Sequence, residues 1–212
     1  MTAVIEVPLS RFIDFVGAKS PDARERKIVE IKRQLEEGYS PFGDPYKLLR
    51  EKIIAANGQP LRDDDLEDLR INSTRVDLHA LGKRYNKFVK LGLKPHPPRK
   101  GTWEFSDPSE GTLRIKVNPD IAYFFGNEDH PRQVKFYFKK GPPDKRQAKI
   151  AYQAMHEALH LPADQLAIVA LRRRLSPPQE AIIPIHSKVS SSELQKLLRR
   201  EAKFFLITWN DV

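Results

Sequence analysis

The fold is decided by Thr112-Leu-Arg-Ile-Lys-Val-Asn-Pro-Asp-Ile-Ala-Tyr-Phe-Phe125, in which apolar and polar residues alternate. A turn at Gly126-Asn-Glu-Asp129 separates this stretch from Arg132-Gln-Val-Lys-Phe-Tyr-Phe-Lys139, which alternates in the same way. A period of two is typical of a strand that buries one face and exposes the other. The sequence therefore predicts two neighbouring strands joined by a hairpin turn.

A helix is predicted after the second strand, starting at Lys145. Asp144 precedes it and Gln147 follows three residues later, which is the pattern of a capping box. Further on, the apolar run Leu166–Leu171 indicates a buried strand, and Ile182–Ile185 is a second candidate strand.

The first hundred residues indicate helices separated by turns. Apolar residues at helical spacing predict helices over residues 22–37, 45–56 and 74–91. Lys94-Pro-His-Pro-Pro-Arg-Lys-Gly101 then predicts a connector, because proline leaves little room for regular structure. We expect an α/β (α+β) fold. Residues 101–212 would form a small mixed sheet with flanking helices, and residues 1–100 a helical region packed on that core.

Composition limits the classes of function. The chain holds 37 Lys and Arg against 28 Asp and Glu, and this formal net charge of +9 attracts polyanions such as nucleic acid. It contains no cysteine, which excludes disulfides and thiolate zinc sites. It has neither an apolar run long enough to span a membrane nor the pattern of a signal peptide. We expect a cytoplasmic protein without a membrane partner.

Positive charge is concentrated in one stretch. Between Leu78 and Trp103 there is no acidic residue, and the basic residues are Lys83, Arg84, Lys87, Lys90, Lys94, Arg99 and Lys100. A helix and connector with charges of one sign can follow the phosphates of a nucleic acid. The alternative is a basic face that only keeps the protein in solution.

Trp103-Glu-Phe105 predicts a further short strand before the two described above. From residue 74 onward the predicted order is then helix, three strands, helix and strand, which resembles the core of the PD-(D/E)XK nucleases. Pro119-Asp120 lies on one predicted strand and Gln133-Val-Lys135 on the next. The resemblance implies that Asp120 and the residue at Gln133 hold a divalent metal such as Mg²⁺, and that Lys135 positions the attacking water. The family usually has Asp or Glu at the position of Gln133, so the core would be degenerate. In the alternative, Gln133 and Lys135 form the solvent face of an ordinary strand.

The string His156-Glu-Ala-Leu-His160 matches H-E-x-x-H on a predicted helix and resembles the zincin peptidases. Two histidines at i and i+4 share one face of a helix and can bind one Zn²⁺, while the glutamate acts as general base. The resemblance implies that His156, Glu157 and His160 are the zinc site of a hydrolase. In the alternative, the two histidines are exposed on the polar side of the helix.

The segments Ile115–Asp120 and Val134–Lys139, the helix with Arg146 and the strand Ala167–Arg173 also resemble a family of bacterial proteins of unknown function. This resemblance covers residues 100–212, and the corresponding helix of that family carries no histidine pair. Three hypotheses follow: nucleic-acid association on a nuclease-like core, a zinc hydrolase, and an interaction protein without catalysis. Whether the protein is an enzyme, which cofactor it holds and its oligomeric state stay open.

Overall fold

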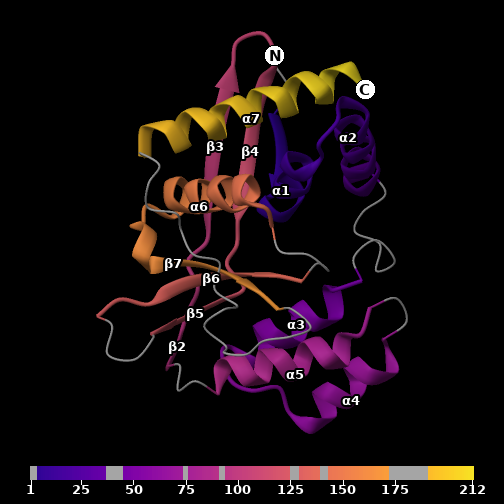
Figure 1. Cartoon of the computed structure of the whole chain (residues 1–212), viewed down its shortest axis with the longest axis vertical. Coiled ribbons are helices and arrows are strands. Elements are labelled where there is room, and N and C mark those ends of the chain that lie inside the picture. Colours follow the sequence, from indigo (N-terminus) through magenta and orange to yellow (C-terminus); the bar gives the residue numbers. More distant parts are fainter. Residues whose placement is uncertain are drawn as a thin grey trace.

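The computed structural model describes residues 4–36, 45–73, 76–90, 94–124, 129–138, 143–171 and 191–212. Within these ranges the chain forms two sheets with helices packed around them (Figure 1). The elements in chain order are β1 (Val4–Pro8), α1 (Leu9–Gly17), α2 (Pro21–Glu36), α3 (Lys47–Ala56), α4 (Asp63–Ile71), α5 (Leu78–Val89), β2 (Lys94–His96), β3 (Gly101–Asp107), β4 (Gly111–Val117), β5 (Ile121–Phe124), β6 (Arg132–Tyr137), α6 (Lys145–Leu159), a 3-10 turn (Ala163–Gln165), β7 (Leu166–Ala170) and α7 (Ser191–Asp211).

Both sheets are mixed. The first has the order β1-β4-β3, in which β4 runs parallel to β1 and antiparallel to β3. The second has the order β2-β5-β6-β7, in which only the β6–β7 pair is parallel. The α/β fold expected from the sequence is confirmed, and its strands divide between two sheets.

The stretch predicted as one strand, Thr112–Phe125, is in fact two strands in different sheets. β4 ends at Val117 and β5 begins at Ile121. Pro119 between them has no N–H to donate to a ladder, and the N–H of Asp120 donates to Val134 O at 2.8 Å, where pairing with β6 begins. Val117 and Ile121 keep the same phase, so the alternation in the sequence hides the break.

Two apolar cores lie on opposite faces of the second sheet. β7 is apolar throughout and contributes to both: Leu166 and Ile168 belong to the first core, Ala167 and Val169 to the second. This pattern is typical of a strand covered on both faces. The first core joins the first sheet to α1, α2, α6 and α7, and the second packs α3, α4 and α5 against β5 and β6.

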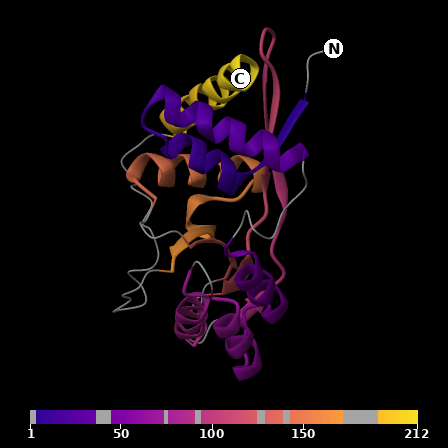
Figure 2. The same cartoon turned by 90° about the vertical axis from the view of Figure 1, so that its right-hand side faces the viewer.

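The first sheet is covered on one side. Figure 2 shows α1, α2, α6 and α7 stacked on the same side of the β3–β4 hairpin. The residues of β4 alternate between buried and more exposed positions, as a sheet with one covered face requires. On the exposed side, ion pairs cross the strands from Arg114 to Glu104 at 2.7 Å and from Lys116 to Glu6 at 2.5 Å.

A buried carboxylate joins the helices of the first core. Glu201 on α7 is fully buried and pairs with Arg24 of α2 at 3.1 Å and with Arg146 of α6. A buried charge is costly unless it is paired, so these two arginines fix where α2 and α6 meet α7.

Several elements differ from the expectation at their ends. α5 begins at Leu78 rather than Thr74, because the side chain of Asp77 caps it by accepting from Ala80 N–H at 2.9 Å. β1 lies in the region expected to be helical, and β2 forms within the proline-rich connector, where it pairs with β5. The predicted capping box of α6 is confirmed.

The candidate strand Ile182–Ile185 lies outside the described residues. Among the helices that are described, none combines the length and the apolar character needed to cross a bilayer.

Burial of tyrosines makes the folded state sensitive to alkali. Burial raises the pKa of Tyr85 and Tyr152, and it raises the pKa of Tyr137 to about 12, with Asp14 and Asp144 adding to the effect. In an unfolded chain tyrosine loses its proton near pH ~10. Above that pH the unfolded state releases protons that the folded state keeps, so stability falls as pH rises.

We therefore expect the free energy of unfolding to decline between about pH 10 and about pH 12. Urea titrations over this range measure it, and Tyr137→Phe is predicted to make the decline shallower. An unchanged decline in Tyr137→Phe would contradict this assignment.

Candidate functional site

Asp120 lies in the break between the two sheets and is 4% exposed. Its Oδ1 accepts a hydrogen bond from Lys135 Nζ at 2.9 Å, and its Oδ2 accepts one from the N–H of Phe136 at 2.8 Å. Lys135 Nζ also donates to Asn118 O at 2.9 Å, and Arg50 Nε of α3 lies 3.8 Å from Oδ1. These contacts connect the break between the sheets to β6.

The sequence analysis did not identify Arg50 and Asn118 as neighbours of Asp120, because an arginine on a helix and a carbonyl in a loop form no recognisable sequence pattern.

The structure brings Asp120 and Lys135 together and gives Gln133 a separate partner. Gln133 is 1% exposed, and its Oε1 accepts from the N–H of Arg99 at 2.8 Å. The interpretation of Gln133 as part of a solvent face is therefore wrong. The segment before β3 thus satisfies the oxygen of this buried amide.

The residues around Asp120 do not fit a Mg²⁺ site. Magnesium requires several oxygen ligands in near-octahedral geometry. Asp120 already accepts hydrogen bonds on both oxygens, and one donor is an ammonium that a cation would have to displace. Within the described ranges, no group of three or more His, Cys, Asp or Glu residues could hold a metal ion. The hydrogen bonds from Lys135 and Phe136 are sufficient to explain Asp120 as a residue that stabilises the fold.

The H-E-x-x-H string does not lie wholly on a helix. α6 ends at Leu159, and His160 is its C-cap with φ 53° and ψ 44°, in the left-handed region. A left-handed residue ends a helix and turns the chain away. The expectation that His156 and His160 share one helical face is therefore wrong, because His160 is outside the helix.

The other two residues of the string contact the chain nearby. His156 Nδ1 lies 2.7 Å from Leu161 O, which anchors the turn after α6. Glu157 Oε1 accepts from Gln153 Nε2 at 2.8 Å and from Gln195 Nε2 at 3.1 Å. Since Gln195 belongs to α7, Glu157 links α6 to α7.

Most residues of the basic stretch are exposed, on α5 and along the chain that follows it to β3. We call six of its residues, all exposed, the basic surface: Lys83, Lys87, Lys90, Lys94, Arg99 and Lys100. Arg84 is half-buried and is not part of this set. None of the six forms an ion pair with any residue in the described part of the chain. By contrast, some exposed lysines elsewhere are paired, as in Lys203 with Asp107 at 3.0 Å.

The geometry of α5 places three of these lysines in a row. Lys83, Lys87 and Lys90 follow the i, i+4, i+7 spacing of one helical face, and the apolar face opposite is buried in the second core. At 1.5 Å per residue the row extends over about 10 Å. The other three charges follow directly in β2 and in the segment before β3.

A loop after α3 holds α5 and β2 together. Leu61 N–H donates to Asn86 Oδ1 at 2.7 Å, and Asn86 Nδ2 donates back to Leu61 O at 2.9 Å, which fixes the loop on α5. Gly58 in the same loop has φ +80°, and a Cβ placed there would lie 3.1 Å from Cβ of Pro95 in β2. The two parts of the basic surface are thus attached to one support.

Removal of the Asp120 side chain is predicted to destabilise the fold. Asp120→Ala leaves the buried Phe136 N–H unsatisfied and Lys135 without its counterion, at a cost of about 2 to 4 kcal/mol in urea titrations. Asp120→Asn keeps an acceptor for Phe136, so its cost is smaller. Asp129→Asn changes an exposed aspartate in the same way and serves as control, with a change below about 0.5 kcal/mol. Equal stability of Asp120→Ala and wild type would contradict the structural role.

Comparison with known proteins does not assign the chain. No family model matches it, and no curated protein does either. The resemblances to a nuclease core and to a bacterial family stay expectations from the sequence, and the function is argued from geometry.

Proposed function

We propose that this protein binds nucleic acid by contacting its phosphates with the basic surface. The observation that carries the proposal is the row of exposed cations on α5, continued through β2, none of which pairs with a described acidic group. Cations without counterions in the described part of the chain can replace the ions condensed on a nucleic acid, and the release of those ions drives binding.

The composition of the surface favours nucleic acid over an anionic membrane. Peripheral membrane helices insert an apolar face between the lipids, whereas the apolar face of α5 is buried in the second core. The large apolar residues exposed in the described ranges lie elsewhere: Val4, Val29, Leu35, Ile54, Ile71, Phe204 and Val212.

The aromatic residues of this region favour recognition of the backbone over recognition of bases. Tyr85 and Phe88 are at most 1% exposed and Trp103 is 8% exposed, so none of them can stack on an unpaired base. Proteins that prefer single strands rely on such stacking. The surface is therefore suited to the regular phosphate rows of a duplex, without sequence preference.

The proposal is for binding rather than cleavage. The carboxylate that the nuclease resemblance assigns to catalysis, Asp120, is engaged with Lys135 and Phe136. No contact in the described structure favours a hydrolytic role over this one.

The salt dependence of binding tests the proposal. If all six cations contact phosphates, log K against log salt has a slope of about −5 for a duplex of mixed sequence. Replacing Lys83, Lys87 and Lys90 by Gln is predicted to make the slope shallower by about 2.7, since each phosphate contact contributes about 0.9. Fluorescence anisotropy between low and moderate salt measures both.

The matched control removes three lysines that form ion pairs elsewhere: the half-buried Lys47 and the exposed Lys116 and Lys203. It has the same net charge as the α5 variant, and its slope is predicted to equal that of wild type. Undetectable binding at low salt, or equal slopes for both triple variants, would refute the proposal. Binding to anionic vesicles but not to DNA would assign the surface to membranes.

A second prediction follows from the buried aromatic residues. Two duplexes of unrelated sequence are expected to bind within about twofold of each other, and single strands of the same length more weakly. Competition titrations compare these ligands directly. A strong preference for single strands would show that bases are stacked and would contradict recognition of the duplex backbone.

A further inference from the structure

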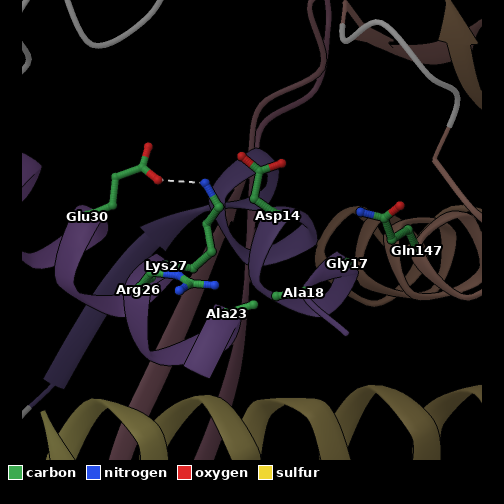
Figure 3. Close-up of a pocket in the computed structure, with 8 residues that line it drawn as sticks. All are labelled: Asp14, Gly17, Ala18, Ala23, Arg26, Lys27, Glu30 and Gln147. Atoms are coloured by element: carbon green, nitrogen blue, oxygen red, sulfur yellow. Dashed lines mark hydrogen bonds and ion pairs between the residues drawn. The ribbon is translucent and has the colours of Figure 1, made fainter. Parts of the chain in front are cut away.

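A pocket opens between α1, α2 and the first turn of α6. Its volume is about 520 Å³, which lies within the range of small-molecule sites. Figure 3 shows Asp14 of α1 beside Lys27 and Glu30 of α2, and Gln147 of α6 across from them. Arg26 of α2 also lines this space. None of these residues belongs to the basic surface.

Gln147 is the residue of α6 that lines the pocket. Its Oε1 accepts from Asp144 N–H at 2.9 Å in the capping box, and its Nε2 donates to Ile13 O at 3.0 Å. Gly17 permits this close approach, because a Cβ there would lie 2.1 Å from Gln147 Nε2. A primary amide has two N–H donors, and the contact with Ile13 accounts for one of them.

The charged lining contains both signs in equal number. The carboxylates are Asp14 and Glu30, and the cations are Arg26 and Lys27. Lys27 Nζ pairs with Glu30 Oε2 at 2.6 Å, and Arg11 lies behind the carboxylates, 3.5 Å from Glu30 and 3.9 Å from Asp14. The side chain of Asp14 is 8% exposed, so solvent screens its charge only weakly.

We propose that this pocket binds a small zwitterion, such as a free amino acid, with its ammonium at Asp14 and its carboxylate at Arg26. A lining of balanced charge gives a simple cation or a simple anion little net attraction. A ligand that carries both charges can meet both partners at once, and the carboxylate can use the bidentate geometry of a guanidinium.

The size of the residues that line the pocket limits the class of ligand further. Gly17, Ala18 and Ala23 contribute no long side chain to the pocket, and the long side chains that line it, Asp14, Arg26, Lys27, Glu30 and Gln147, all end in charged or polar groups. The ligand is therefore recognised by its charged ends, and its side chain is short or directed to solvent.

An NMR titration of the ¹⁵N-labelled protein without nucleic acid tests this site. Glycine and L-alanine are the probes, and acetate and methylammonium are the single-charge controls. The amides of Gly17, Ala18 and Ala23 are expected to shift and saturate with the zwitterions at millimolar concentrations, and the single-charge compounds to bind at least about tenfold more weakly.

Arg26→Gln tests the anionic end, and because Arg26 is exposed the variant is expected to fold. It is predicted to weaken zwitterion binding at least about tenfold. Arg33→Gln is the matched control on the same helix, outside the pocket, and leaves binding unchanged. Absence of saturable shifts, equal binding of acetate alone, or full binding by Arg26→Gln would overturn the proposal.

Discussion

The salt bridge between Asp120 and Lys135 is the contact on which the arrangement of the two sheets depends. β4 and β5 are joined by three residues, and the chain must leave one sheet and enter the other within them. Asp120 stabilises that passage by accepting from Lys135 and from Phe136 N–H on β6. A buried carboxylate is tolerated only with such partners. With the junction fixed, β7 can supply side chains to two cores, and α5 is held against the second of them.

Some elements of the fold are encoded locally and could be predicted. The capping box at Asp144 fixes the start of α6, and the continuous apolar run of β7 signals a strand covered on both faces. Other features depend on distant contacts. The break at Asp120 is invisible because the alternation keeps its phase across it, and β1 is too short to be recognised before its pairing with β4 is known.

The same distinction applies to the candidate sites. The charge of the basic stretch is visible in the sequence, whereas its exposure depends on which face of α5 the second core buries. The histidine pair satisfied a local motif, yet the left-handed conformation of His160 placed it outside the helix. The charged pocket was missed because Asp14, Arg26 and Gln147 come from three helices and have no common pattern.

The contacts of the Asp120 carboxylate with Lys135 and Phe136 indicate that it stabilises the fold and holds no metal ion at the sheet junction. Titration of Mn²⁺ into the ¹⁵N-labelled protein tests this most directly, because a bound paramagnetic ion broadens the amide signals around it. We predict that the amide signals of Phe136 and Asn118 stay as sharp as those of the rest of the protein. Selective broadening of these two signals at substoichiometric Mn²⁺ would contradict it.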